Sequence, residues 1–226
     1  YNNISDGFFG GSVGSIAVAK NDPNVIYVGG GEVTLRGNVS SGYGVFKSVD
    51  AGKTWNYSGL PNSRHIPRIV IDPNNNDIVY AAVLGNIYKP TDERGVYKSI
   101  DGGASWKKVL FVNNLSGAFE IVLDPNNPRV LYASTWRVQR TPYSLSSGGD
   151  GSTLWKSTDN GENWKKISDN SGFPSGVLGV IGVTVSPVNS ERVWVIVENQ
   201  EKGGVYRSDD SGKNWTYTNS SRSLRQ

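Results

Sequence analysis

A nine-residue pattern with an aspartate at its fourth position occurs four times in the chain. It reads KSVDAGKTW at residues 47–55, KSIDGGASW at 98–106, KSTDNGENW at 156–164 and RSDDSGKNW at 207–215. A repeated carboxylate could form a working site, bind a cation or stabilise a turn. A calcium loop of the D-x-D-x-D-G kind needs more oxygen ligands and a terminal glutamate, which this pattern lacks. The sequence therefore predicts a structural role for these aspartates and no metal site.

Each residue type in the pattern suits a tight turn. The aspartate can accept hydrogen bonds from backbone N–H groups, the glycine two positions later permits a positive φ, and the serine hydroxyl adds a local bond. The tryptophan ring can then pack between neighbouring repeats. The predicted structural residues are Ser48, Asp50, Gly52, Trp55, Ser99, Asp101, Gly103, Trp106, Ser157, Asp159, Gly161, Trp164, Ser208, Asp210, Gly212 and Trp215.

The repeats have a period near 50 residues. Their aspartates are 51, 58 and 51 residues apart, and a second marker, a turn containing Pro23, Pro73, Pro125 or Pro187, keeps the same order. Within one repeat, two apolar runs joined by a Pro-Asn turn predict a β-hairpin, and the residues around the aspartate turn predict a second hairpin. Four strands per repeat, repeated four times, indicate the blades of a β-propeller.

The predicted fold is therefore all-β, a β-propeller built from four-stranded antiparallel blades. We expect one propeller segment over residues 1–226, with blades at about 14–60, 66–111, 118–168 and 179–218. Propellers have about four to eight blades, so four blades are expected to form an arc of a larger ring. The segment 144–152, SLSSGGDGS, is predicted to be a flexible loop that extends the third blade.

The pattern S-x-D-x-G-x-T/S/N-W resembles the Asp-box, also called the bacterial neuraminidase repeat. That repeat occurs in sialidases, sortilin-type propellers, xyloglucanase-type glycoside hydrolases and a photosystem assembly factor. The stretches RHIPRIVIDP, DERGVYKSIDGG and WRVQRTPYSLSSGG are similar to large secreted bacterial proteins labelled sortilin-like or glycosyl-hydrolase-like. The resemblance implies a propeller whose Asp-boxes lie on the outer rim, away from a ligand site, and a secreted, periplasmic or bacterial cell-surface location.

Because successive strands of a blade run in opposite directions, their connections fall alternately at two opposite ends of the blade. The Pro-Asn turns and aspartate turns share one end, and the long irregular loops share the other. These loops carry arginines, acids and aromatic residues, among them Tyr43, Tyr88 and Tyr143. The candidate ligand-binding residues are Glu32, Arg36, Arg64, His65, Arg68, Glu93, Arg94, Trp136, Arg137 and Arg140.

Two interpretations of these loop residues remain open. Converging arginines and aromatic rings are what an acidic or carbohydrate-like ligand would meet. Alternatively, the arginines could pair with Glu32 and Glu93 and connect adjacent blades. His65, the only histidine, is expected to be a hydrogen-bonded structural residue.

Composition excludes several classes of protein. The net charge is only +3 and the chain has no run of basic residues, so the sequence does not indicate a nucleic-acid-binding surface. No apolar stretch is long enough for membrane insertion. With no cysteine and one histidine, thiolate and two-histidine metal sites are excluded, and no cofactor is expected. The chain has no methionine and begins at Tyr1, which suggests a processed or excised piece of a longer polypeptide.

Three functions fit this pattern. The first is a binding or scaffolding module that presents its loops to a protein, peptide or glycan, with no assigned catalytic residue. The second is a sialidase-like or xyloglucanase-like glycoside hydrolase, whose acids would lie among Glu32, Glu93 and neighbours from further blades. The third is a structural ring within a larger surface or membrane assembly.

Overall fold

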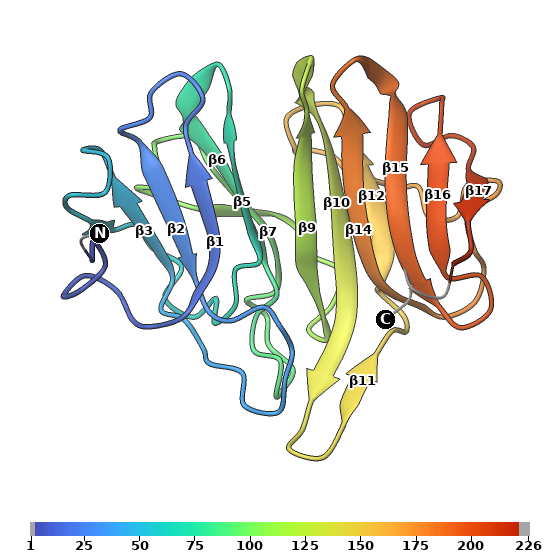
Figure 1. Cartoon of the computed structure of the whole chain (residues 1–226), viewed down its shortest axis with the longest axis horizontal. Coiled ribbons are helices and arrows are strands. Elements are labelled where there is room, and N and C mark those ends of the chain that lie inside the picture. The colour runs from blue at the N-terminus through green and yellow to red at the C-terminus, as the bar shows by residue number, and fades with distance from the viewer. Residues whose placement is uncertain (1–2, 222–226) are drawn as a thin grey trace.

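The computed structural model describes residues 3–221, which form four antiparallel sheets placed side by side in an arc (Figure 1). This all-β architecture of four-stranded blades confirms the predicted fold class. No helix that could cross a membrane occurs in residues 3–221.

Each sheet is one blade, numbered here in chain order. Blade 1 contains β1 (Val13–Val18), β2 (Ile26–Gly30), β3 (Val45–Ser48) and β4 (Asn56–Tyr57). Blade 2 contains β5 (Arg68–Asp72), β6 (Asn75–Val83), β7 (Gly95–Ser99) and β8 (Lys107–Leu110). Blade 3 contains β9 (Ser116–Asp124), β10 (Asn127–Arg140), β11 (Leu145–Ser147), β12 (Thr153–Ser157) and β13 (Lys165–Lys166). Blade 4 contains β14 (Leu178–Ser186), β15 (Asn189–Asn199), β16 (Gly204–Ser208) and β17 (Thr216–Asn219).

The strands of every blade follow each other up and down in sequence order, apart from the insertion of β11. The Pro-Asn turns and the aspartate turns consequently lie at one end of the blades, called the motif face below (Figure 1). The connections from the second to the third strand, and from one blade to the next, lie at the other end, called the loop face. The first strands β1, β5, β9 and β14 contact each other in turn. A groove of about 620 Å³ runs along these strands.

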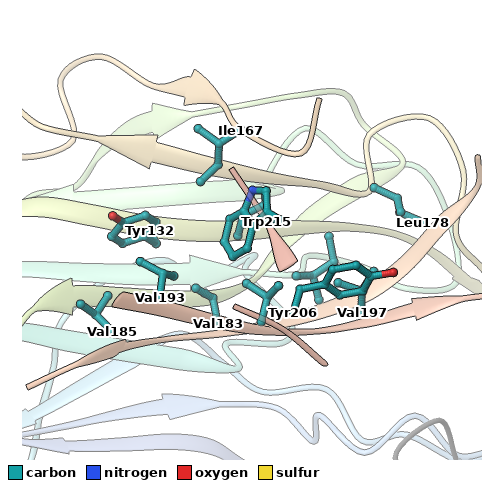
Figure 2. Packing of buried hydrophobic residues seen from close by; sticks show 12 residues of the cluster. Tyr132, Ile167, Leu178, Val183, Val185, Val193, Val197, Tyr206 and Trp215 are labelled. Atoms are coloured by element: carbon teal, nitrogen blue, oxygen red, sulfur yellow. The ribbon is translucent and has the colours of Figure 1, made fainter. Parts of the chain in front are cut away.

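Three apolar layers hold the blades together, because each strand turns alternate side chains toward the preceding and following blade. In blade 3, Leu131 and Ala133 pack toward blade 2, whereas the intervening Tyr132 packs toward blade 4. Figure 2 shows Tyr132 in one layer with Val183, Val193 and other side chains of blade 4. The contacts between blades are therefore made by alternate side chains along the strands and not by long connections.

Blade 3 departs from the predicted outline. The segment 144–152 was expected to be a loop, but Leu145–Ser147 forms β11 and pairs with residues 138–140 of β10. The 14-residue β10 extends beyond its blade neighbours, so the backbone groups at its end need another partner, and β11 provides it. The resulting hairpin projects past the other blades on the loop face (Figure 1).

Candidate ligand-binding face

The four aspartate turns satisfy their polar groups internally. In the first turn, the Ser48 hydroxyl donates to the Asp50 carboxylate (2.8 Å) and accepts from the Gly52 N–H (2.8 Å). The same carboxylate accepts from the N–H and the hydroxyl of Thr54 (2.9 and 2.7 Å). Equivalent bonds occur around Asp101, Asp159 and Asp210.

These hydrogen bonds favour the ionised carboxylates. The bonds from Thr54 and Ser48 lower the pKa of Asp50 to about 2, and matching bonds lower the pKa values of Asp101, Asp159 and Asp210 to about 2. Within residues 3–221, no group of three or more histidine, aspartate or glutamate side chains is placed to hold a metal ion. The motif carboxylates are therefore engaged inside their own turns.

The loop face stands on a separate apolar cluster. Val39 of blade 1, Leu84 and Ile87 of blade 2, and Trp136 and Val138 of blade 3 are buried together. The indole N–H of Trp136 donates to the Ser147 hydroxyl (2.9 Å), and its ring packs edge-on against Phe119. Trp136, predicted to bind a ligand, is thus placed in the base beneath the loops.

Direct hydrogen bonds also connect the loops of blades 1, 2 and 3. The Tyr88 hydroxyl donates to the Val39 carbonyl (3.0 Å). The Arg140 backbone N–H donates to the Ile87 carbonyl (2.8 Å), and its side-chain Nε donates to the Arg36 carbonyl (2.9 Å). The candidates Arg36 and Arg140 are therefore brought together, and three loops that are distant in sequence form one surface.

Glu32 pairs within its own blade. Its carboxylate accepts from Arg36 (Nε–Oε1 3.0 Å) and from the Ser40 N–H (3.3 Å), and these bonds lower the pKa of Glu32. Its backbone carbonyl contacts Nδ1 of the fully buried His65 at 2.8 Å. Because a carbonyl only accepts, Nδ1 of His65 carries the proton. Burial lowers the pKa of His65, so the ring is neutral at pH 7.

Of the two interpretations left open by the sequence, the one in which arginines pair with Glu32 and Glu93 across blades is wrong for both glutamates. Glu32 pairs with Arg36 four residues away, and the Glu93 carboxylate accepts from the Thr91 hydroxyl. Of the candidate arginines, Arg68 of blade 2 does form an ion pair across blades, with Glu120 of blade 3 (Nε–Oε1 2.5 Å). At the motif face, Lys98 and Lys107 of blade 2 also pair with Glu162 of blade 3. Sequence reasoning missed Glu120 because it lies within a strand. A single glutamate in the otherwise apolar run GAFEIVL was the available signal.

Arg94 is fully buried without a carboxylate partner among the described residues. Its Nη2 donates to the carbonyls of Asn86 (2.6 Å) and Val138 (3.3 Å). Burial, with a smaller contribution from the nearby Arg137, lowers the pKa of Arg94 to about 10. It stays charged at pH 7, so this part of the loop face has an excess of positive charge.

Two further arginines lie closer to solvent. Arg137 donates from Nη1 to the Ser146 hydroxyl (2.6 Å). Arg64 adopts a positive φ of 59°, and its carbonyl accepts from the Gly42 N–H (2.7 Å). The exposed Arg64 side chain forms no ion pair with another residue in 3–221, so its charge is available to a ligand.

Most of the exposed aromatic rings of this face are tyrosines, and Phe111 lies in the connection from blade 2 to blade 3. Tyr43, Tyr88 and the 96% exposed Tyr143 come from the loops of blades 1, 2 and 3. The exposed large apolar side chains in the turns of the motif face, by contrast, are the aliphatic Val49, Ile100 and Val188. Ring surfaces available for stacking are therefore concentrated on the loop face.

The acids of the loop face fall into two groups. The carboxylates of Glu32, Glu93 and Glu120 are engaged as described above. Glu198, which the prediction also missed, accepts from the Ser147 hydroxyl (2.7 Å) and the Val180 N–H (2.9 Å). The carboxylates of the exposed Asp92 and Asp150 make no hydrogen bond or ion pair with the rest of residues 3–221.

The chain was compared with known families and proteins. Residues 43–172 match the model of the Sortilin-Vps10 family, described as sortilin and neurotensin receptor 3. The xyloglucanase Xgh74A of Acetivibrio thermocellus is 27% identical over 226 residues, which cover 91% of this chain and 24% of that protein. A xyloglucanase of a Paenibacillus species is 28% identical over 228 residues, which cover 90% of this chain and 21% of that protein. The chain therefore spans about a quarter of the length of these relatives.

Solved structures show the same fold at lower identity. The GH74 xyloglucanase of Xanthomonas campestris matches 92% of this chain and 29% of its own, with a TM-score of 0.66 and 21% identity. YCF48 of Cyanidioschyzon merolae matches 94% of this chain and 57% of its own, with a TM-score of 0.51 and 17% identity. At these identities the likeness concerns the fold alone.

Proposed function

The chain belongs to the Sortilin-Vps10 family, and from this premise we propose that its loop face binds a glycan as part of a carbohydrate-active propeller. The observation that carries the proposal is that the loops of blades 1, 2 and 3 each carry an exposed tyrosine ring, Tyr43, Tyr88 and Tyr143. The curated relatives named above are xyloglucanases, which favours a polysaccharide over a peptide as the ligand.

The chemistry of the loop face suits such a ligand. Tyrosine offers an apolar ring face and a polar hydroxyl in one rigid side chain, at low entropic cost. Arginine supplies several fixed donors, and Arg64 and Arg137 can donate to ligand hydroxyl oxygens. The bonds between loops hold the surface in place before binding, so little ordering is required when a ligand arrives.

We further propose a location outside the cytoplasm, in a secreted, periplasmic or cell-surface protein, because a polysaccharide ligand would be met there. The blades over about 14–60, 66–111, 118–168 and 179–218 would act as one segment of a larger ring. A role in a larger surface assembly is compatible with this arrangement, since the motif face would remain free of the glycan.

Binding is tested with soluble xyloglucan oligosaccharides and calorimetry, or with affinity electrophoresis in xyloglucan gels. Replacing Tyr43, Tyr88 and Tyr143 together with alanine should weaken binding by about tenfold or more, since exposed aromatic rings carry much of the energy in such contacts. Tyr57→Ala is the matched control, because Tyr57 is also exposed but lies on β4. Equal affinity of the triple variant and the control would contradict the proposal.

Glycan hydrolysis is the second candidate, favoured by the similarity to xyloglucanases over about nine-tenths of the chain. A hydrolase needs two carboxyl groups that are free to act on the bond. The glutamates first proposed for this role are engaged, so Asp92 and Asp150 are the better candidates. Release of reducing ends from xyloglucan, abolished by Asp92→Asn or Asp150→Asn but not by Glu32→Gln, would support hydrolysis. Binding without release would leave the chain as a glycan-binding segment.

A further inference from the structure

The three internal blade interfaces differ in the charges that they bring together on the motif face. Each interface combines the first residue of one motif, the residue directly after the tryptophan of that motif, and the residue two positions before the tryptophan of the next motif. These residues are Lys47, Asn56 and Ala104 between blades 1 and 2, Lys98, Lys107 and Glu162 between blades 2 and 3, and Lys156, Lys165 and Lys213 between blades 3 and 4.

The interface between blades 2 and 3 balances its charges. The Glu162 carboxylate accepts from the buried Lys98 (2.7 Å) and from the exposed Lys107 (3.2 Å). These two lysines lower the pKa of Glu162. Together with the motif carboxylate of Asp101, this interface has two positive and two negative groups, so it offers no excess charge to a ligand.

The interface between blades 3 and 4 has a third lysine in place of the acid. Lys213 occupies the motif position of Glu162, and Lys156 and Lys165 keep the two lysine positions. Within residues 3–221, Lys165 and Lys213 form no ion pair. The ammonium group of Lys156 donates to a neutral acceptor, the Ser211 carbonyl (3.0 Å). The positive charge of this interface is therefore not neutralised by an acid of the following turn.

A pocket of about 340 Å³ opens at this interface. Lys156, Lys165 and Lys213 all line it, and the partly buried Trp164 and the buried Ile167 supply apolar lining. All of its lining residues belong to blades 3 and 4, the connection between them, and the motif turn on the side of blade 4 that meets blade 3. The pocket consequently lies inside the arc of blades and not at either of its ends.

The lining of this pocket carries an excess of positive charge. Among the described residues that line it, the acid is Asp159, whose carboxylate is engaged by the Asn163 side chain (2.7 Å) within its own turn. Three lysines against one carboxylate leave two positive charges in excess. Burial and then the charge of Lys213 lower the pKa of Lys156, so the two lysines are close enough to repel each other. A bound anion would relieve this repulsion.

We propose that this pocket binds an oxyanion, the phosphate or sulfate ester of a sugar-sized ring. The oxyanion would accept hydrogen bonds from the ammonium groups of Lys165 and Lys213, each of which has three donors. The ring would lie against Trp164, whose indole offers a large apolar surface. The volume of the pocket is typical of small-molecule sites. The inference goes beyond glycan binding and uses no residue of the loop face.

Binding is tested by NMR titration with two glucose monoesters, the phosphate and the sulfate of the primary hydroxyl, in a buffer free of both anions. The indole N–H of Trp164 and the backbone N–H of Lys213 report on the pocket. Both esters should shift these signals with a Kd of about 1 mM or lower, which a titration to about 10 mM detects. Glucose should cause no shift, and inorganic phosphate and sulfate should bind more weakly because they lack the ring.

The variant Lys213→Glu restores the acid that the neighbouring interface has in Glu162. The new carboxylate can pair with Lys156 and Lys165, so the protein should remain folded, which thermal unfolding verifies. Its affinity for the esters should fall by about tenfold or more, because a like charge then faces the anion. Lys53→Glu is the matched control, since Lys53 has the same motif position in blade 1 but lies outside the pocket. This control changes the net charge equally and should leave the affinity unchanged.

Three results would overturn the proposal. The first is the absence of any shift with either ester up to the highest concentration. The second is an equal loss of affinity in Lys213→Glu and Lys53→Glu, which would reduce binding to the net charge of the protein. The third is inorganic phosphate or sulfate that binds as tightly as the esters, which would show that the pocket does not recognise a ring.

Discussion

The motif face and the loop face are built at opposite ends of the same strands, but they use different rules. Four copies of one turn on the motif face repeat the same hydrogen bonds around Asp50, Asp101, Asp159 and Asp210. On the loop face each connection is different, and its contacts join residues that are far apart in sequence, as Arg140 and Arg36 are. Local chemistry thus fixes one end of the blades, and packing between loops fixes the other.

This difference separates stability from binding. The motif turns lie beside the apolar layers between blades and contribute to each blade contact through carbonyls such as that of Ser211. The exposed tyrosines of the loop face contribute little to any described layer. Substitutions on the motif side should therefore affect unfolding, whereas substitutions of exposed loop residues should affect ligands.

The largest expected effect comes from Tyr132→Ala. Tyr132 is fully buried between blades 3 and 4, and its hydroxyl donates to the Ser211 carbonyl (3.3 Å). Removing the ring should lower the free energy of unfolding by about 3–5 kcal/mol, as for other large aromatic residues in cores. Tyr143→Ala, on an exposed ring, should change it by less than about 0.5 kcal/mol. Urea unfolding measures both values, and similar losses for the two variants would break the distinction between the faces.

A smaller effect is expected for Ser157→Ala in the third motif turn. The buried Ser157 hydroxyl accepts from the Gly161 N–H (2.9 Å) and donates to Asp159 (2.8 Å). Its removal leaves a buried donor unpaired, which should cost about 1–3 kcal/mol. Ser146→Ala is the loop-face match, since the exposed Ser146 hydroxyl accepts from Arg137 and water can replace it. Unfolding curves that show an equal loss for Ser146→Ala would contradict this reasoning.

The predictability of the two faces from sequence differs for the same reason. The four-stranded blades could be predicted because the hairpin and turn signals lie within a few residues of each other in every repeat. The partners of the loop arginines could not, because a sequence gives no distance between Arg68 and Glu120, which meet across two blades. Trp136 was assigned to the binding face from its residue type, yet it is buried where three loops pack together.

The smallest effect, and the most specific to the motif face, should appear in acid. Hydrogen bonds lower the pKa of Asp159 to about 2 from its ordinary value of 3.8. The folded chain therefore binds this proton less readily than the unfolded chain. The stability contributed by the ionised carboxylate is fully present above pH 4 and is lost as the pH falls from 4 toward 2. Melting temperatures measured from pH 7 to pH 2 should therefore fall most steeply between pH 4 and pH 2.

The variant Asp159→Asn isolates the contribution of one turn to the loss of stability in acid. Such a variant is needed because other acids titrate in the same pH range. This variant should melt at a lower temperature than the parent chain at pH 7, since the amide accepts the turn's hydrogen bonds more weakly than a carboxylate. The difference between the two proteins should then shrink as the pH falls from 4 to 2, where the parent carboxylate becomes protonated. Asp150→Asn, which changes a carboxylate without hydrogen bonds on the loop face, should leave the curve unchanged. Parallel curves for Asp159→Asn and the parent would show that the motif carboxylate does not stabilise the fold through its charge.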